Sequence, residues 1–424
     1  MSEKSTPSTR FDGFTNAWEQ RKGSRAVPAL RFKADDGSAF PEWEEKKLGD
    51  IAEKIDRKAT SESTADIRMI SQGEGFILQS RKYSRQNAGK SLSKYLLLKK
   101  NEFAYNHGAS KAKPFGVTYR LVESSEARVP YVYHAFSITQ GDLGFWSYAL
   151  NTESIERQLQ KMITSGVRMD GLLNISFEAY MSVSIPFPCV AEQHKIASLL
   201  SSVDETLDLC QRKLDLLTQA KKALVQQIFS RKLRFKADDG SDFPEWEEKK
   251  LGEIFTERVE RSSTGELISV TINQGVVKSS DLDRRDNSSS DKSNYKVVRV
   301  GDIAYNSMRM WQGASGASQY SGILSPAYTV VIPRKGQDVS FWEYQFKSDL
   351  MLYRFTINSQ GLTSDTWNLK YPLFSKISVQ VPSLPEQQKI ASCLSSADAL
   401  INQARADLEQ WREVKKSLLQ QLFV

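Results

Sequence analysis

The strongest constraint on this chain is an internal repeat of 21 residues. RFKADDGSAFPEWEEKKLGDI begins at Arg31 and RFKADDGSDFPEWEEKKLGEI begins at Arg234, and the two copies differ at only two positions. A second pair of matching segments runs from Ala191 to Phe229 and from Pro385 to Phe423. Duplication on this scale predicts one architecture built twice, each copy made of an opening motif, a variable region and a closing segment.

The closing segments have the apolar spacing of long helices that pair with another helix. Apolar residues alternate at intervals of three and four over about four heptads, as in the a/d seam of a coiled coil. Each seam is interrupted once, by Lys221 and Lys415, and a polar seam residue commonly fixes the register. We expect the two helices to pair antiparallel; the alternative is that each packs only on its own domain. The seam residues expected to pack are Leu200, Leu207, Leu214, Leu217, Leu224, Ile228, Leu394, Ile401, Leu408, Trp411, Leu418 and Leu422.

The two variable regions have diverged but still correspond in places. YLLLKKNEFAYN from Tyr95 aligns with YKVVRVGDIAYN from Tyr295, and NISFEAYMSVSIPFP from Asn174 aligns with NLKYPLFSKISVQVP from Asn368. Short apolar runs with β-branched residues, bounded by Gly and Pro, predict strands in these segments. ALNTESIERQLQKMIT and VSFWEYQFKSDLMLYRF are predicted to be helical. Each variable region is therefore expected to form a compact domain with its own core.

These patterns predict an α+β protein in which two globular α/β domains are separated by two long helices that form an antiparallel coiled coil. The tandem repeat gives this arrangement a pseudo-two-fold symmetry. A broken third copy of the opening motif, TRFDGFTNAWEQRK, begins at Thr9. The expected divisions are a tail, the first domain, the first helix, the second domain and the second helix, at residues 1–30, 31–190, 191–230, 231–384 and 385–424.

Composition excludes several classes of protein. Among 424 residues, 58 Lys and Arg against 51 Asp and Glu give a net charge of +7, which permits a polyanionic partner without demanding one. The 3 Cys have no metal-binding spacing and fit a reducing compartment. The sequence has no signal peptide and no apolar run that could cross a membrane, so we expect a cytoplasmic protein. It also lacks a phosphate-binding P-loop, a nucleophile elbow and a metal-spaced histidine cluster.

One pattern leaves an enzymatic alternative open. Asp36 is followed by Glu44–Lys46, and the second copy repeats this arrangement at Asp239 and Glu247–Lys249. An acid followed by E-x-K can bind Mg²⁺ and activate water in nucleases. The neighbouring Gly, Pro and Trp residues favour a charged, solvated turn that leads into a strand.

Both variable regions contain loops that mix basic, amide and aromatic side chains. The loops begin at Gln79 and Asn106 in the first region and at Asp281 and Asn306 in the second. Arg and Lys suit phosphates and guanine edges, whereas Asn and Gln suit adenine edges. For each residue the alternative is a solvated loop without a partner. The candidates for DNA contact are Arg81, Lys82, Arg85, Asn106, Lys111, Lys113, Arg284, Arg285, Lys292, Asn306, Arg309, Trp311 and Gln312.

Taken together, the motifs resemble the specificity subunit of a type I restriction–modification system over nearly the whole chain. The residues that carry the resemblance are the FPEWEEKKLG openings at Phe40 and Phe243, the P-x-x-x-E-Q-x-K-I-A helix starts at Pro188 and Pro382, and the QQ-[IL]-F helix ends. The resemblance implies that each variable domain is a target recognition domain for one half of a split DNA site. It further implies that the coiled coil sets the spacer and that the repeated segments dock two methyltransferase subunits.

The same resemblance implies that the chain is not an enzyme by itself. Methyltransferase subunits would bring S-adenosylmethionine, restriction subunits would bring ATP hydrolysis with Mg²⁺, and this chain would bind neither cofactor nor metal. The implied partners are double-stranded DNA, two methyltransferase subunits and, in the full complex, restriction subunits, with no membrane involved. A coiled-coil scaffold that binds proteins but no DNA is a further alternative.

Overall fold

A computed structural model describes residues 28–60, 63–82, 89–108, 110, 113–163, 172–283, 288–364 and 366–423. The chain forms two compact units: unit 1 comprises residues 1–209 and 408–424, and unit 2 comprises residues 210–407. Both long helices, α5 (Val190–Phe229) and α10 (Leu384–Leu422), are divided between the units. The broken motif copy that begins at Thr9 lies outside the described residues.

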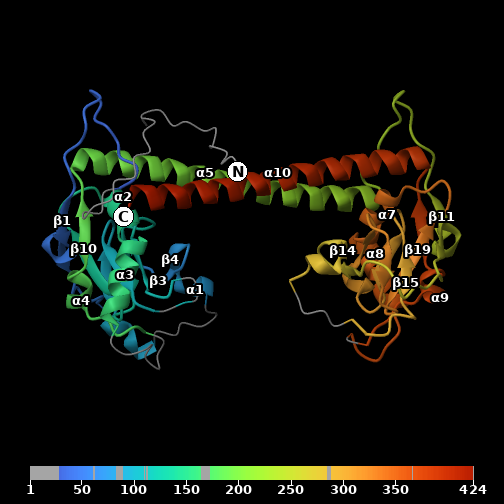
Figure 1. The fold of residues 1–424 in the computed structure, drawn as a ribbon, viewed down its shortest axis with the longest axis horizontal. Coiled ribbons are helices and arrows are strands. Elements are labelled where there is room, and N and C mark those ends of the chain that lie inside the picture. The colour runs from blue at the N-terminus through green and yellow to red at the C-terminus, as the bar shows by residue number, and fades with distance from the viewer. Residues whose placement is uncertain are drawn as a thin grey trace. The chain divides into compact units, whose positions relative to one another are not determined.

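Unit 1 is built on a four-stranded antiparallel sheet with the strand order β2-β9-β6-β7. Figure 1 labels β1, β3, β4 and β10 of this unit. Two further antiparallel pairs, β3 with β4 and β5 with β8, belong to the same unit. A separate pair joins β1 of the opening motif to β10 at the end of the variable region. The strands are β1 (Glu44–Lys47), β2 (Ala52–Lys54), β3 (Arg68–Ser71), β4 (Gly75–Leu78), β5 (Leu96–Lys99), β6 (Phe103–Asn106), β7 (Val117–Arg120), β8 (Glu126–Val129), β9 (His134–Ile138) and β10 (Ser184–Phe187).

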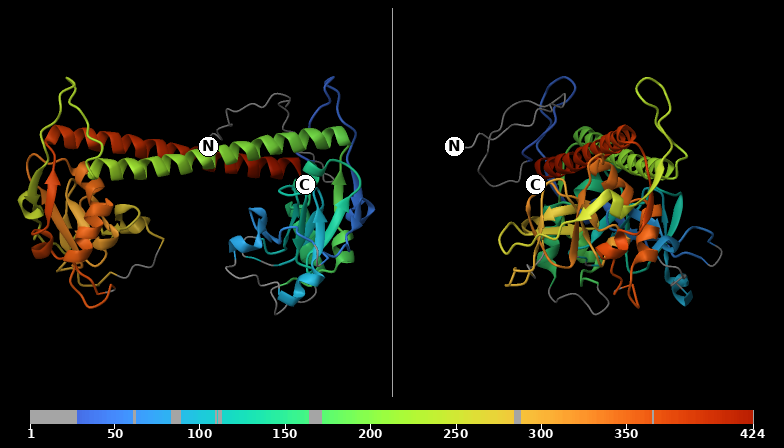
Figure 2. Two further views of the ribbon diagram at one scale, coloured as in Figure 1. Left: turned by 180° about the vertical axis from the view of Figure 1, so that it is seen from behind. Right: turned by 90° about the vertical axis from the view of Figure 1, so that its right-hand side faces the viewer.

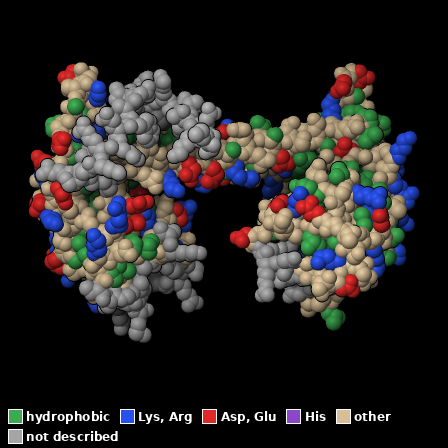
Figure 3. Space-filling model, viewed as in Figure 1, with side chains coloured by type: hydrophobic (Ala, Val, Ile, Leu, Met, Phe, Trp, Pro, Cys, Tyr) green, Lys and Arg blue, Asp and Glu red, His purple; other side chains and the backbone are tan. Residues whose placement is uncertain are grey.

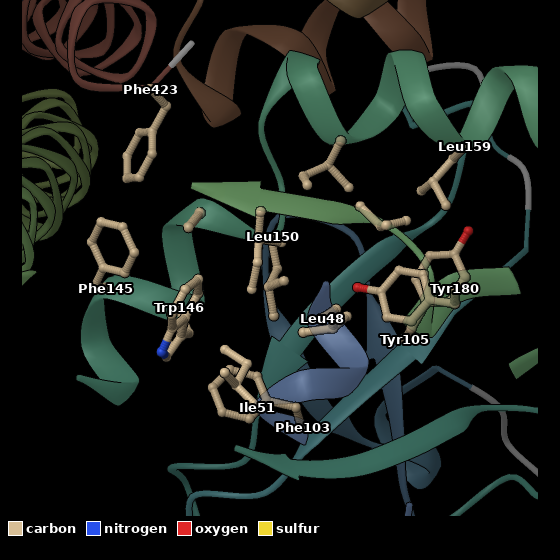
Figure 4. Close-up of a cluster of buried hydrophobic side chains, with 14 of the residues drawn as sticks. Leu48, Ile51, Phe103, Tyr105, Phe145, Trp146, Leu150, Leu159, Tyr180 and Phe423 are labelled. Atoms are coloured by element: carbon tan, nitrogen blue, oxygen red, sulfur yellow. The ribbon is translucent and has the colours of Figure 1, made fainter. Parts of the chain in front are cut away.

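The helices of unit 1 enclose its main core. Asp142 caps α2 by accepting a hydrogen bond from the amide of Phe145 at 2.8 Å. Figure 4 shows Phe145 and Trp146 of α2 facing this core, together with Phe423, whose ring centroid lies 5.5 Å from that of Phe145. The end of the chain thus packs into the core of unit 1. The shorter helices are α1 (Gln79–Lys82), η1 (Leu48–Asp50), η2 (Gly89–Lys94), α2 (Leu143–Ala149), α3 (Glu153–Met162) and α4 (Phe177–Met181).

Unit 2 has the same topology as unit 1. Its four-stranded sheet has the order β12-β19-β16-β17, and its accompanying pairs are β13 with β14, β15 with β18, and β11 with β20. The strands are β11 (Glu247–Lys250), β12 (Phe255–Glu257), β13 (Ile268–Thr271), β14 (Gly275–Lys278), β15 (Lys296–Val298), β16 (Ile303–Asn306), β17 (Ser315–Ala317), β18 (Gly322–Leu324), β19 (Tyr328–Pro333) and β20 (Ser378–Val381). The helices are α6 (Leu251–Ile254), η3 (Ser279–Asp281), η4 (Met310–Gln312), α7 (Val339–Phe346), α8 (Asp349–Asn358) and α9 (Tyr371–Phe374). The duplication therefore extends through the diverged regions.

The predicted strands around Tyr95 and Tyr295 are confirmed as β5, β6, β15 and β16. The strand prediction from Asn174 and Asn368 is wrong in its first half, where α4 and α9 precede β10 and β20. Ser176 explains why a helix forms in unit 1, because its hydroxyl accepts a hydrogen bond from the amide of Ala179 and caps the first turn of α4. Among the helices that the structure describes, none is long and apolar enough to cross a bilayer.

Within each unit, α5 and α10 pack antiparallel. In unit 1, Leu200 near the start of α5 shares a core with Leu418 and Leu422 near the end of α10. In unit 2, Ile228 at the end of α5 shares a core with Leu394 near the start of α10. Every predicted seam residue is buried or half-buried, whereas off-seam Leu209 is 64% exposed. The predicted fold class, with two α/β domains and antiparallel long helices, is confirmed.

A buried carboxylate in the first turn of each long helix holds the opening motif. Glu192 is fully buried and accepts hydrogen bonds from Arg31 Nε and Nη2 at 3.1 and 2.7 Å. The indole nitrogen of Trp43 donates to the same carboxylate at 2.8 Å. In unit 2, Arg234 binds the fully buried Glu386 in the same way, at 3.3 and 3.1 Å. Because a buried charge is tolerated only when it is paired, these contacts attach the first residue of each motif to its long helix.

The next residue of each helix, also buried, attaches the globular domain. The Gln193 side chain accepts a hydrogen bond from the amide of Asp142 at 2.7 Å and donates one to the carbonyl oxygen of Pro188 at 2.8 Å. Gln387 does the same with Asp338 at 2.9 Å and with the carbonyl of Pro382 at 2.9 Å. The repeated Glu-Gln pair therefore joins the opening motif, the long helix and α2 or α7.

The two copies differ at one point that provides a matched test. Trp43 donates to Glu192, whereas the buried indole nitrogen of Trp246 has no hydrogen-bond partner among the described residues. We expect Trp43→Phe to lower the free energy of unfolding by about 1.5–3 kcal/mol more than Trp246→Phe, because only the former removes a hydrogen bond to a charged group. Urea unfolding of the full chain, followed by circular dichroism, measures both variants. Equal losses would contradict the role assigned to the Trp43 hydrogen bond.

Candidate nucleic-acid interface

The predicted recognition loops begin at the same structural position in both units. Asn106 ends β6 and Asn306 ends β16, and each side-chain oxygen accepts the amide two residues further on at 3.0 Å. Such Asx turns start a loop directly at the end of a strand. Each side-chain oxygen is therefore already engaged in shaping the loop. In unit 1 the return to β7 uses Gly116, where φ is +80° and an added Cβ would lie 2.5 Å from the carbonyl oxygen of Asn106.

The predicted loop of unit 1 that begins at Asn106 contacts the turn of the β3–β4 hairpin near this edge of the sheet. The hydroxyl of Ser110, in the connection from β6 to β7, donates to the Gln72 side chain at 2.6 Å. The amide of Gly73 donates to the hydroxyl of Tyr119 on β7 at 2.9 Å. The turn of the β3–β4 hairpin is therefore fixed against the β6–β7 connection, and α1 follows β4 directly.

In unit 2, four of the candidate residues lie in one short connection. Asn306 leads through Arg309 into η4, which contains Trp311 and Gln312. Trp311 is half-buried, and its indole nitrogen donates a hydrogen bond to the carbonyl oxygen of Met308 at 3.2 Å. Its ring packs edge-on against that of Trp367, with the ring centroids 5.2 Å apart. Gln312 is exposed and Arg309 is half-buried. The connection is thus a short turn that carries the Arg309 guanidinium and, within the same turn, the Gln312 amide.

The remaining candidates have different surroundings. Arg81 and Lys82 are exposed on α1, and Arg81 lies 3.8 Å from Glu74. Lys113 is half-buried and pairs with Glu156 on α3 at 2.6 Å, which gives it a structural partner. Lys292 is half-buried. Outside the described residues lie Arg85, Lys111, Arg284 and Arg285. For every candidate, contact with DNA stays a prediction.

A polar cavity of about 970 Å³ lies beside the predicted second-region loop from Asp281. Its walls include Ser279, Asn294, Tyr295 and Tyr328. On the face of each unit seen in Figure 3, Lys and Arg side chains are interspersed with Asp and Glu. The visible charge distribution is therefore mixed, and any DNA contact on this face has to come from individual side chains.

The layer beneath the loops differs between the units. In unit 1, His107 is buried with its ring nitrogens 2.8 Å from the carbonyl oxygens of Leu173 and Val132. Its ring stacks on that of His134 at 4.8 Å. In unit 2 the position after Asn306 is Ser307, whose hydroxyl lies 2.8 Å from that of Thr329. The two recognition loops are thus supported by different polar pairs.

The acid/E-x-K pattern is part of the exposed frame. Asp36 accepts hydrogen bonds from the amide and hydroxyl of Ser38 at 2.9 and 2.6 Å. Lys46, on β1, lies 3.7 Å from Glu44. Within the described residues, no group of three or more His, Cys, Asp or Glu side chains is placed to hold a metal ion. No observation therefore favours the nuclease hypothesis.

Several structurally important residues were not predicted as sites. The buried Glu192 and Gln193 recur as Glu386 and Gln387, so their exact repetition was the available signal. Tyr148 and Tyr344 contact the long helices. They end the short motifs FWSY and FWEY, which begin at Phe145 and Phe341 inside the diverged regions. Their partners lie more than 50 residues away in the chain, and a single sequence gives no sign of such contacts.

Comparison with known proteins connects this architecture to one family. Residues 244–410 match the type I restriction modification DNA specificity domain. Over 291 residues the chain is 23% identical to the type I restriction enzyme MjaVIII specificity subunit of Methanocaldococcus jannaschii, covering 62% of this chain and 67% of that protein. The fold resembles the S subunit of a type I restriction–modification system from M. genitalium, with a TM-score of 0.53 at 17% identity, covering 94% and 99% of the two chains. It also resembles a chain from a study of complex assembly and conformational transition of the type I R-M system, with a TM-score of 0.51 at 14% identity, covering 90% and 98%. The resemblance seen in the motifs is confirmed.

The histidine pair predicts a pH dependence that belongs to unit 1. Burial lowers the pKa of His134 below its ordinary value of 6.5, and the neighbouring His107 lowers it further. The unfolded chain therefore takes up this proton first as the pH falls below about 6.5, and stability is lost on acidification. We expect thermal unfolding between pH 7.5 and 5.5 to show a smaller acid-induced loss in His134→Gln than in the natural chain. An unchanged pH dependence would contradict this assignment.

Proposed function

We propose that this chain is a specificity subunit of a type I restriction–modification system, which reads the two halves of a split DNA site and holds methyltransferase subunits over them. The observation that carries the proposal is the contrast, within each unit, between repeated segments and connections that differ. The opening motif is nearly identical in both copies and the long helices match at their two ends, whereas the connections at the end of β6 and β16 differ. Different loops on one duplicated frame are what two different half-sites require.

The repeated segments support the docking of like partners at both units. The loop of residues 33–39 projects from the body of unit 1 (Figure 2). Ala34 and Ser38 close it through a 2.9 Å backbone hydrogen bond, and Ala237 and Ser241 close its copy in the same way. Hydrogen bonds from Ser38 hold the pKa of the Asp36 carboxyl below its usual value, so this exposed group stays charged. The same charged shape occurs twice, as docking of two methyltransferase subunits requires.

In this proposal the chain supplies affinity and sequence choice, and its partners supply the chemistry. Methyltransferase subunits bind S-adenosylmethionine and turn an adenine out of each half-site for N6-methylation. Restriction subunits, recruited through them, use ATP and Mg²⁺. The paired long helices set the number of unspecified base pairs between the half-sites. No cofactor or metal is assigned to this chain.

Mapping N6-methyladenine across the genome of a host that co-expresses the chain and its methyltransferase subunit tests the proposal. We expect one split motif with two specific halves and a fixed spacer. An intact, soluble complex that methylates no such motif would contradict the DNA-reading function and favour the scaffold alternative.

The β16–β17 connection offers a sharper test of the reading residues. We expect Arg309→Ala combined with Gln312→Ala to relax base choice in one half-site by about tenfold, because one good base contact discriminates by about 1–3 kcal/mol. Lys335→Ala is the control, since it removes an exposed cation from the turn after β19, at the opposite end of the sheet. Methylome mapping of both variants reads out the result. Loss of specificity in both half-sites, or in neither, would contradict the assignment.

A further inference from the structure

The lysines that interrupt the two seams are paired across the helices. In unit 1, Lys415 of α10 places its ammonium 2.5 Å from Oδ1 of Asp204 on α5, and the two side chains are 29% and 37% exposed. The hydroxyl of Tyr148, on α2 of the globular domain, donates to Oδ2 of Asp204 at 2.8 Å. The lysine ammonium also lies 5.7 Å from the centre of the Tyr148 ring. We call these three residues the unit 1 clasp.

Unit 2 contains the same arrangement. Lys221 of α5 lies 2.5 Å from Oδ1 of Asp398 on α10, and the hydroxyl of Tyr344 on α7 donates to Oδ2 at 2.8 Å. The ammonium of Lys221 lies 5.1 Å from the ring centre of Tyr344. These three residues form the unit 2 clasp. In each clasp one carboxylate joins both long helices and one helix of the globular domain, α2 in unit 1 and α7 in unit 2.

The tyrosine hydroxyls are held as donors. Burial, followed by the Asp204 carboxylate, raises the pKa of Tyr148 well above its usual value. Burial together with the hydrogen bond to Asp398 does the same for Tyr344. Each aspartate therefore receives one hydrogen bond from a neutral tyrosine hydroxyl beside the one from the lysine ammonium. Three groups from three helices satisfy one another only in a single geometry.

The apolar seam alone does not enforce that geometry. A slide of seven residues keeps an a/d stripe in phase, because its pattern repeats with that period. In unit 1 the slide would place Lys415 opposite Ala197 or Gln211 in place of Asp204. It would also remove the acceptor of Tyr148. A polar contact at a seam position thus discriminates between registers, although an apolar pair at the same place would pack as well or better.

From these contacts we infer that the two clasps fix the register of the helices and the rotation of each recognition domain on them, and so determine which spacer length the protein accepts. This inference rests on the proposed function. The six clasp residues are positioning residues: they act through the placement of the domains and touch no base. They are separate from the loop residues that choose bases.

The test uses the full chain co-expressed with its methyltransferase subunit. The substrates are plasmid sites that keep both half-sites and vary the spacer by one or two base pairs in either direction. Lys221→Met combined with Lys415→Met removes both ion pairs and replaces each lysine with an apolar side chain of similar length. We expect methylation at neighbouring spacers to rise about tenfold relative to the natural spacer, because a charge-assisted hydrogen bond discriminates on this scale. Base choice within the half-sites stays the same.

The adjacent lysines provide the matched control. Lys222 and Lys416 are exposed on the same helices and face away from the seam. We expect Lys222→Met combined with Lys416→Met to keep the natural spacer preference. If the seam variant also keeps it, the clasps do not set the spacer and the inference is wrong. If the natural chain methylates no split site at all, the proposed function fails first, so the two failures are distinguishable.

A second variant keeps the test decisive if the lysine variant does not fold. Tyr148→Phe combined with Tyr344→Phe removes two hydroxyl groups and leaves both ion pairs and all ring packing in place. The same broadening of spacer preference, smaller in size, is expected. An unchanged preference in this variant, with the protein folded, would show that the domains need no tie to the aspartates for spacer choice.

Discussion

Each unit depends on a carboxylate that is fully buried in the first turn of its long helix. Glu192 and Glu386 are fully buried, so each must be paired within the fold. Arg31 and Arg234 provide the pairing, and these arginines are the first residues of the repeated motif. The two ends of each variable region are thereby joined. A region fixed at both ends can change its loops without losing its place in the molecule.

The sequence alone allowed prediction of the architecture but not of its polar contacts. The repeat and the seam predicted two like domains and antiparallel long helices, because periodicity reports which faces are buried. The helical turns at α4 and α9 were missed, since Ser176 and its neighbours read as part of a strand. The buried Glu192 and the clasp aspartates were missed for another reason. Their partners are distant in sequence, so the sequence does not show that these charged helix residues are buried or partly buried and paired within the fold.

Divergence between the units reaches below the recognition loops. His107 and His134 support the loop of unit 1, whereas Ser307 and Thr329 occupy the equivalent place in unit 2. The clasps, the arginine–glutamate pairs and the glutamine contacts recur across the same comparison, apart from the hydrogen bond that Trp43 makes to Glu192. Contacts that hold helices and domains together are therefore kept, whereas contacts beneath the loops that we propose to face DNA vary.

We propose that the variable region of each unit alone determines the half-site that the unit reads. The most direct test replaces residues 52–183 with residues 255–377, which keeps the β1–β10 pair and both long helices. Methylome mapping of a host expressing this chimera with its methyltransferase subunit gives the result. The account predicts a site made of two inverted copies of the half read by unit 2, with the spacer unchanged. A motif identical to that of the natural chain, from an intact complex, would contradict it.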